Sequence, residues 1–251
     1  MMEPREPALV EPGHGFFKAR SSERVLFLPA GPMARIFATR FLARKKSSRP
    51  YPARMYRLKR KLEHQPGRPK VEIDLVGPGM GAPVAAMVVE MLIAGGAKTI
   101  VALGFAGSLD PSLKIGDLLL VKDALCDEGT GPSYVPGLKT ISASEPLLAA
   151  AASELGLRNE KIHAGMVVST DAFFRETRAK LDHFHSQGAL AVEMEMSALY
   201  ALARFRGIEV LGMVVISDEL FGESWNCGVT SPGMLLNFMK AGSLALSVLA
   251  R

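Results

Sequence analysis

A segment that alternates strand, glycine turn, helix and strand constrains the fold of this chain more than any other. The apolar run Val71–Val76 ends in Gly77-Pro78-Gly79-Met80-Gly81, and Ala82–Ala94 then shows helical spacing before a glycine pair. The next apolar run, Thr99–Leu103, follows directly. Two parallel strands need a crossover connection of this kind, usually a helix. The segment therefore predicts one unit of a parallel α/β sheet.

The same alternation continues toward both ends of the chain. Further strands are expected at Arg24–Leu28, Leu118–Val121, His163–Val168 and Val210–Ile216. Further helices are expected at Met33–Ala43, Ser142–Leu155, Thr177–His185, Met196–Phe205 and Pro232–Leu249, with a Gly/Pro-rich loop at Cys126–Pro136. We therefore predict the α/β class, with a mixed, mostly parallel sheet flanked by helices on both faces.

Composition and length exclude several classes of protein. The chain has 251 residues, 48% of them hydrophobic, which is enough to bury a large core in one domain or two. No apolar run reaches the length of a membrane span, and residues 1–20 lack the apolar core of a signal peptide. Cys126 and Cys227 lie far apart, which argues against a zinc site and a disulfide. We expect a cytoplasmic protein with no membrane partner and no bound metal.

The positive charge of the chain is concentrated between Arg40 and Lys70, within a formal net charge of +5. Such a run can bind nucleic acid or an acidic small molecule, but most often it forms a solvated face. Tyr51 and Tyr56 are too few to form a platform on which bases stack. No nucleic-acid partner is therefore expected, and the sequence leaves the role of this basic stretch open.

Two carboxylates, Glu193 and Glu195, interrupt the apolar run Ala191–Ala198 at a predicted strand-to-helix junction. Residues two apart at a strand end project to the same side. Burying a carboxylate is costly unless it is paired or hydrogen-bonded, so the pair is expected to face a polar ligand or water. Because carboxylates only accept hydrogen bonds, a ligand rich in hydroxyl groups, such as a ribose, suits them. The alternative is a solvated junction without a ligand.

Two further patterns suggest ligand binding at strand ends. Gly77–Ala82 matches the dinucleotide pattern G-x-G-x-x-G/A, but the following strand ends in Ala102-Leu103-Gly104-Phe105, without the acidic residue that such sites use to hold the ribose. A nicotinamide or flavin enzyme is therefore disfavoured. Asp218 follows the apolar strand Val210–Ile216 and could protonate a leaving group. The alternative is that Asp218 only caps a turn or a helix.

A series of short motifs occurs in order along the chain. They are Gly77–Pro83, Gly104–Asp117, Asp127-Glu128-Gly129-Thr130, Ser169-Thr170-Asp171-Ala172-Phe173, Val192-Glu193-Met194-Glu195 and Ser217-Asp218. In this order they resemble the nucleoside phosphorylase and uridine phosphorylase family. The resemblance runs from about Arg24 to the C-terminus, which implies one domain over residues 24–251. Residues 1–23, rich in Glu, Pro, Gly and Ser, are expected to form a loosely ordered N-terminal arm.

The resemblance implies cleavage of the N-glycosidic bond of a nucleoside. It places Glu193, Met194 and Glu195 at the ribose, with Met194 packed against the sugar and Glu195 accepting from its hydroxyls. It places Phe173 in a stack on the base. Asp218 matches the acid that protonates the base in purine-cleaving members. An oxocarbenium-like transition state would then be stabilised at both ends, by a carboxylate and by the protonated leaving group.

The resemblance does not fix which base is cleaved. Asp218 favours a purine, whereas uridine-type members use other polar groups to bind the base. Arg175 and Arg178 are the nearest candidates for such contacts in this sequence. Purine and pyrimidine substrates therefore both remain possible.

The resemblance also places a nucleophile or phosphate pocket, to which Gly31, Arg35, Gly79, Gly104 and Phe105 would contribute. Phosphorolytic members carry an arginine in the turn after the first strand, and here Arg35 stands one place late. They carry a second arginine before a later glycine, where this chain has Ala102 and Phe105. Arginine is the usual bidentate clamp for phosphate. Phosphate and water are therefore both candidates for the nucleophile.

Three functions follow from these observations. The first is phosphorolysis to free base and ribose 1-phosphate, with phosphate as co-substrate held by Arg35 or by an arginine of the basic stretch, and with no other cofactor. The second is a nucleosidase that uses water. The third is a non-catalytic nucleoside-binding protein. The expected partner is a small-molecule nucleoside, and the resemblance implies a homo-oligomer, a dimer or a hexamer.

Overall fold

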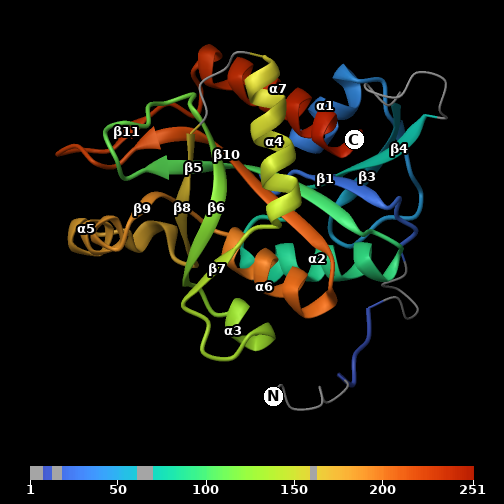
Figure 1. Ribbon diagram of the computed structural model, residues 1–251, viewed down its shortest axis with the longest axis horizontal. Coiled ribbons are helices and arrows are strands. Elements are labelled where there is room, and N and C mark those ends of the chain that lie inside the picture. Colours follow the sequence, from blue (N-terminus) through green and yellow to red (C-terminus); the bar gives the residue numbers. More distant parts are fainter. Residues whose placement is uncertain (1–7, 13–18, 61–69, 159–162) are drawn as a thin grey trace.

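The computed structural model describes residues 8–12, 19–60, 70–158 and 163–251, and it confirms the predicted α/β class. An 11-stranded mixed sheet lies at the centre and helices cover both of its faces (Figure 1). The helices are α1 (Met33–Arg40), α2 (Ala82–Ala94), α3 (Gly131–Tyr134), α4 (Glu145–Leu157), α5 (Arg178–Ser186), α6 (Met196–Arg206) and α7 (Pro232–Leu249), with a 3-10 helix η2 at Phe173–Arg175. The strands are β1 (Arg24–Phe27), β2 (Arg44–Lys45), β3 (Arg54–Arg60), β4 (Val71–Gly77), β5 (Thr99–Ser108), β6 (Leu118–Asp127), β7 (Thr140–Ser142), β8 (His163–Thr170), β9 (Ala189–Glu193), β10 (Glu209–Glu219) and β11 (Asn226–Cys227).

Part of the sheet closes on itself. Strand β5 pairs with β10, β10 with β6, β6 with β8, β8 with β9, and β9 again with β5. Strands β1, β4, β3 and β2 extend the sheet outward from β5. The pairings of β4, β1, β5 and β10 with one another are parallel, as are those of β6, β8 and β9, and the remaining pairings are antiparallel. The expected crossover units are thus present, with antiparallel strands added at the margins.

Two hydrophobic layers pack on opposite faces of the sheet. Helices α2 and α6 pack against one another and contribute to one buried cluster, whereas α1, α4 and α7 contribute to the other. Figure 1 shows α2 and α6 on one side of the strands and α4 and α7 on the other. Strands buried on both faces explain the near-continuous apolar runs in β1, β5 and β10.

Most predicted elements are confirmed, and the differences follow from contacts between distant residues. Helices α2 and α7 have the predicted bounds. The strand predicted at Thr99–Leu103 is too short, because β5 continues through Gly104–Gly107 to Ser108 and pairs with β10 along that length. Ser142 belongs to β7 and not to the following helix, which starts at Glu145. Pairing with β10 outweighs the local preference of glycine for turns.

The basic stretch contains strand β3, which the sequence analysis did not anticipate. Arg57 of β3 lies 2.7 Å from the fully buried Asp74 and 2.9 Å from Glu72, both on β4. Lys59 also pairs with Glu72, at 3.3 Å. Asp74 and Glu72 of β4 therefore neutralise part of the positive charge of the basic stretch. The other described cations of the stretch are largely exposed, as expected of a solvated face. Residues 61–69 of the stretch lie outside the described residues.

Helix α7 has the length and the apolar composition of a membrane span, but 56% of this helix is buried inside the protein.

Gly242 of α7 packs closely against Phe37 of α1, and a Cβ atom at this glycine would lie 1.7 Å from the phenylalanine ring. We expect Gly242→Ala to lower the free energy of unfolding by roughly 1–3 kcal/mol, since an overpacked core must shift. Gly233→Ala, in the same helix but with no atom within 4 Å of the new methyl group, is the control. Urea unfolding of both variants measures the difference, and equal stabilities would contradict this packing.

Candidate functional site

The carboxyl ends of strands β5, β9 and β10, in the closed part of the sheet, bring the predicted acidic residues together. Gly107 of β5 pairs with Val192 of β9 on one side and with Asp218 of β10 on the other. Neighbouring strands lie about 4.8 Å apart, so the end of β9 and Asp218 are separated by roughly 10 Å. That distance fits a sugar at one end and an aromatic base at the other. Gly107 also leaves room for the acid, because a Cβ there would lie 3.1 Å from Asp218 Oδ2.

Glu193, at the end of β9, is occupied by contacts within the protein. Its carboxylate accepts hydrogen bonds from the Ser169 hydroxyl, from the backbone N–H of Glu195 at 2.6 Å and from that of Met196 at 3.0 Å. These N–H groups lie at the start of α6, where helix donors lack intrahelical partners and negative charge is favoured. Glu193 therefore anchors α6 to the sheet, and little of its acceptor capacity remains for a ligand.

Glu195, the residue before α6, has more acceptor capacity to spare. Its Oε1 accepts from the backbone N–H of Gly81 at 2.6 Å, and the backbone N–H of Met194 also interacts with this carboxyl group. Gly81 directly precedes α2 and has a φ of +84°, a conformation that glycine adopts without strain. The glycine turn thus holds Glu195 in place. Met194 lies between the two acids and is only half-buried, which leaves its side chain open to a ligand.

Burial raises the pKa of both carboxyl groups, and the charge of Glu193 raises the pKa of Glu195 further. Both side chains are almost fully excluded from water. Hydrogen bonds from backbone N–H groups oppose this effect in each case. The pair therefore holds a proton more readily than two exposed carboxylates would.

Asp218 owes its orientation to an irregularity in β10. Ile216 pairs with Ala106 and Asp218 pairs with Gly107, so Ser217 is an extra residue, a β-bulge, on this strand. Asp218 is 5% exposed, and both of its oxygens accept hydrogen bonds. Ser217 Oγ donates to Oδ1 at 2.6 Å, and Trp225 Nε1 donates to Oδ2 at 2.8 Å.

Glu176 lies close enough to Asp218 for their charges to interact, although the sequence analysis did not select it. Burial raises its pKa to about 7, with a further contribution from the charge of Asp218. Lys180 acts in the opposite direction. An acid placed directly after a 3-10 helix gives no recognisable signal in a single sequence, because its interaction with Asp218 depends on the position of β10.

The predicted base-binding residues lie on η2 and at the start of α5. Phe173 is 42% exposed and its ring packs edge-on against Phe174, with 5.1 Å between the centroids. Arg175 is exposed. Arg178 instead donates from Nη1 to the Leu220 carbonyl at 2.6 Å and from Nη2 to a second carbonyl of the segment after β10. Its guanidinium therefore attaches α5 to that segment. Phe173 and Arg175 are then the predicted base-binding residues that are less constrained than Arg178.

The predicted nucleophile pocket divides into two places. Gly31 and Arg35 line a cavity of about 400 Å³ together with Arg54, Tyr56 and the Gly77-Pro78 turn. Neither arginine has an acidic partner among the residues that the structure describes. Arg54 gave no distinct signal in the sequence, because it is one of many cations in the basic stretch.

The other three residues predicted for that pocket lie in the packed interior around it. A Cβ at Gly79 would lie 2.7 Å from Phe27, and one at Gly104 would lie 3.5 Å from the Pro29 ring. Phe105 packs on Phe238 of α7, with 4.4 Å between the ring centroids. Gly104 and Phe105 belong to β5, and none of the three residues lines the cavity.

Two motifs act mainly by joining loops at this edge. Glu128 is buried and accepts from the N–H groups of Thr130 and Gly131 and from the Ser197 hydroxyl. Ser169 accepts from the Ser197 N–H at 2.8 Å while donating to Glu193. The ends of β6 and β8 and the start of α6 are therefore held as one unit, which supports the acids of the site.

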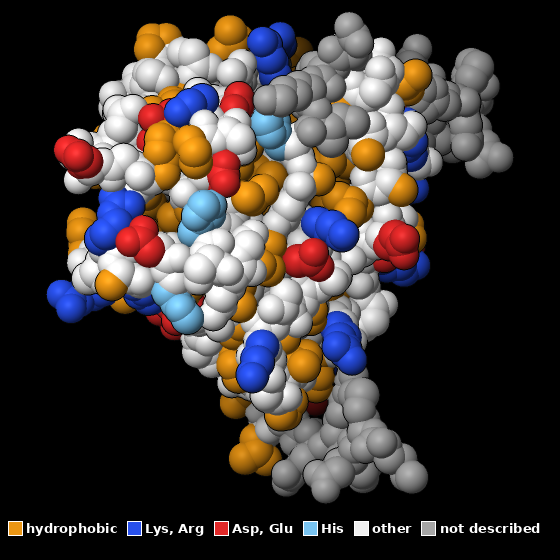
Figure 2. All heavy atoms as spheres, turned by 60° about the vertical axis from the view of Figure 1, so that its left-hand side comes forward, with side chains coloured by type: hydrophobic (Ala, Val, Ile, Leu, Met, Phe, Trp, Pro, Cys, Tyr) orange, Lys and Arg blue, Asp and Glu red, His pale blue; other side chains and the backbone are white. Residues whose placement is uncertain are grey.

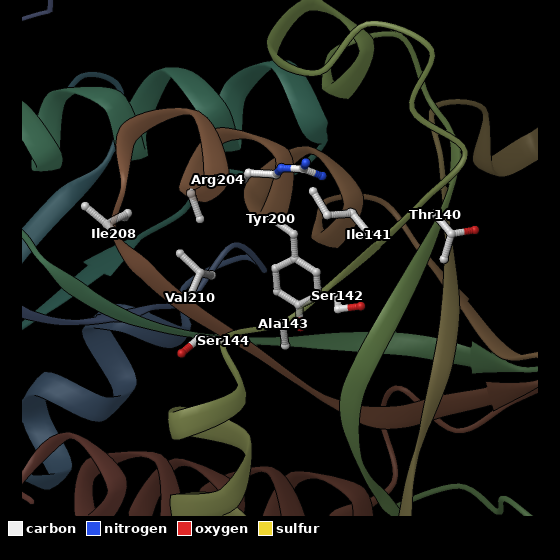
Figure 3. A pocket seen from close by; sticks show the side chains of 10 residues that line it. Thr140, Ile141, Ser142, Ala143, Ser144, Tyr200, Arg204, Ile208 and Val210 are labelled. Atoms are coloured by element: carbon white, nitrogen blue, oxygen red, sulfur yellow. The ribbon is translucent and has the colours of Figure 1, made fainter. Parts of the chain in front are cut away.

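A second cavity, of about 370 Å³, lies between β7 and α6 and is shown in Figure 3. The hydroxyl of Tyr200 reaches its floor, donating to the Val121 carbonyl and accepting from the Gly212 N–H. Arg204 lies at its rim, and Ser144 Oγ is buried without a hydrogen-bond partner among the described residues. None of the predicted site residues lines this cavity.

A family model described as "Phosphorylase superfamily" matches residues 61–235, well over half of the chain. The chain belongs to the phosphorylase superfamily. The order of the motifs had implied this assignment, which is confirmed. The superfamily match spans the Glu195 and Asp218 motifs and Arg178, and it ends early in α7.

Two relatives of this phosphorylase-superfamily chain are nucleoside phosphorylases. A guanosine phosphorylase of Halorubrum lacusprofundi is 31% identical over 153 residues, which is 59% of this chain and 62% of the relative. A DeoD-type purine nucleoside phosphorylase of Bacillus cytotoxicus is 30% identical over 151 residues, which is 59% of this chain and 64% of the relative. The chain thus spans less than two thirds of the length of these relatives.

Solved structures share the fold of this superfamily member at lower identity. Purine nucleoside phosphorylase from Toxoplasma gondii in complex with immucillin-H has a TM-score of 0.80 at 21% identity, covering 92% of this chain and 91% of the other. Uridine phosphorylase from Vibrio fischeri has a TM-score of 0.77 at 22% identity, covering 96% and 98%. AMP nucleosidase from Bacteroides thetaiotaomicron has a TM-score of 0.71 at 20% identity, covering 91% and 87%.

Proposed function

We propose that this chain cleaves the N-glycosidic bond of a nucleoside by phosphorolysis, giving a free base and ribose 1-phosphate. The observation that carries the proposal is the placement of Glu195 and Asp218 at one edge of the sheet, where Glu195 follows β9, Asp218 lies on β10 and β5 pairs with both strands. Membership of the phosphorylase superfamily and the two nucleoside phosphorylase relatives support it. We also propose a cytoplasmic homo-oligomer that needs no cofactor other than phosphate as co-substrate.

In this proposal the two acids act on opposite ends of the bond that breaks. Glu195 accepts hydrogen bonds from the ribose hydroxyls, and its negative charge stabilises the cationic sugar as the C1′–N bond opens. The bonding electron pair leaves with the base, and Asp218 gives its proton to the base. Met194 packs against the sugar, and Phe173 stacks on the base. An oxygen of the phosphate then forms the new bond to C1′.

The phosphate-binding role is assigned to the cavity that contains Arg35 and Arg54. Two guanidinium groups without acidic partners in the described part of the chain are suited to a dianion, because each can donate two parallel hydrogen bonds. The cavity adjoins the Gly77-Pro78 turn, four residues before the N–H that binds Glu195. A phosphate there would approach from the sugar side of the site.

A nucleosidase that uses water is the second candidate. Ala34 and Ala102, at or beside the places where an arginine clamp is expected, are 2% and 0% exposed and carry no charge. The AMP nucleosidase from Bacteroides thetaiotaomicron shares the fold. A chain that lacks the usual clamp could release the base to water while using the same two acids.

Release of free base from a panel of purine and pyrimidine nucleosides, with and without phosphate, distinguishes these functions. We expect turnover that requires phosphate and yields ribose 1-phosphate. Arg54→Met should raise the KM for phosphate about tenfold or more, as the loss of a charge-assisted hydrogen bond predicts, whereas Arg44→Met, another exposed arginine of the basic stretch, should not. Phosphate-independent release of ribose would show a nucleosidase, and binding without turnover would show a nucleoside-binding protein.

A further inference from the structure

A hairpin after the end of β10 brings an exposed tryptophan against the buried acid of the site. Strand β11 pairs antiparallel with β10, with Asp218 opposite Cys227 and Glu219 opposite Asn226. Trp225 directly precedes β11, and its side chain is 58% exposed. Its ring nitrogen nevertheless points inward, 2.8 Å from Oδ2 of Asp218. Figure 2 brings forward the face that carries β11 and α5 in Figure 1, where exposed hydrophobic side chains lie among charged ones.

The two hydrogen bonds to Asp218 differ in kind. Ser217 Oγ lies 2.6 Å from Oδ1 and also 3.3 Å from the Ala106 carbonyl oxygen, so its hydroxyl can donate to either group. When this hydroxyl turns to the Ala106 carbonyl, Oδ1 of Asp218 is left to carry the transferable proton. The indole N–H of Trp225 can only donate. Oδ2 of Asp218 is thus held as an acceptor in both protonation states, and the side chain keeps one rotamer.

Separate contacts fix the hairpin that carries Trp225. Arg178 of α5 donates to the carbonyls of Leu220 and Gly222. Asn226 Nδ2 donates to Glu219 Oε2 at 3.0 Å across the hairpin. The ammonium group of Lys114 lies 4.4 Å from the centroid of the Phe221 ring. The Asn226 bond joins exposed side chains and contributes little, so the Arg178 and Lys114 contacts hold the hairpin without it.

We propose that Trp225 is a positioning residue for Asp218. It aims the carboxyl group at the leaving base and keeps the transferable proton off the lone pair of Oδ2 that faces the indole. The proposal rests on the function assigned above, in which Asp218 protonates the base. Catalysis by a positioned acid depends on geometry before acidity, so loss of the N–H should slow the chemical step more than it weakens nucleoside binding.

The test replaces the donor while keeping an aromatic ring. We expect Trp225→Phe to lower kcat about tenfold or more while the nucleoside KM changes less than twofold, as loss of a hydrogen bond to a charged group predicts. Trp225→His, whose Nε2 lies the same number of bonds from Cα, should recover most of the rate. Asn226→Ala removes the neighbouring cross-hairpin hydrogen bond without touching Asp218, and it should leave kcat unchanged.

Because Trp225 is the only tryptophan of the chain, its fluorescence reports the contact directly. Emission should differ between wild type and Asp218→Ala, and an identical spectrum would overturn the contact. Equal kcat in wild type and Trp225→Phe, or an equal loss in Asn226→Ala, would overturn the positioning role. These outcomes are distinguishable from failure of the proposed function, in which wild type itself releases no base and the assignment falls with it.

Discussion

Asp218→Asn is expected to lower kcat by about 10²–10⁴-fold, the usual contribution of a general acid. The amide has nearly the shape of the carboxyl group and its oxygen can still accept from Trp225, so the bulge and the hairpin should remain in place. What is lost is the proton that the leaving base receives. Steady-state release of base, with far-UV circular dichroism as a check on folding, measures the effect.

Asp182→Asn is the matched control for this variant. Asp182 is 65% exposed and makes only a 3.8 Å ion pair with Arg178, so the same change of acid to amide should leave the rate near that of wild type. An unchanged rate in Asp218→Asn would show that another group protonates the base, and Glu176, whose charge interacts with that of Asp218, would be the candidate. If Asp182→Asn loses as much activity as Asp218→Asn, the loss would reflect impaired folding and not the catalytic role of Asp218.

Glu195→Gln is expected to reduce kcat/KM roughly tenfold to a hundredfold, because a charged acceptor for the ribose hydroxyls becomes neutral. The amide oxygen can still accept from the Gly81 N–H, which keeps the glycine turn attached to the start of α6. A loss confined to KM would mean that Glu195 binds ground state and transition state equally. A loss in kcat would place its charge at the cationic sugar.

The same substitution should make the protein more stable in alkaline solution. The folded pKa of Glu195 is raised above the ordinary value of 4.5, so the folded state binds more protons than the unfolded state between those two values. This contribution to stability is fully present below about pH 4.5 and is lost as the pH rises through the raised pKa. Urea unfolding at pH 8.5 should show Glu195→Gln more stable than wild type by roughly 1–3 kcal/mol. If Glu195→Gln is no more stable than wild type at that pH, the buried charge of Glu195 does not destabilise the folded state.

Local patterns predicted the elements whose signals are local. Helix α2 lies between a glycine turn and a glycine pair, and the first residues of α7 follow a Ser-Pro start, so both bounds could be read directly. Glu195 and Asp218 stood out because acids are rare beside buried strands. Whether they act as the resemblance implies stays a prediction, which the variants above test.

Features that depend on pairing between distant strands could not be predicted. The continuation of β5 through Gly104–Gly107 needs β10 beside it, and the bulge at Ser217 exists only relative to β5. Glu193 and Glu195 look equivalent in the sequence, since both project to the same side. Their difference arises because the start of α6 turns back onto Glu193, whereas Glu195 meets the turn after β4. Trp225 carried no signal either, because its partner lies across a hairpin.

The surplus residue in β10 makes the site sensitive to counting as well as to chemistry. The bulge absorbs this residue, since Asp218 and Glu219 still pair with consecutive residues of β5, Gly107 and Ser108. Removing Ser217 would restore an unbroken ladder with β5, and it would also remove the local bend of β10 and the hydroxyl that donates to Asp218 Oδ1. A hybrid that exchanges β10 between members of the superfamily must therefore preserve the number of residues in this strand.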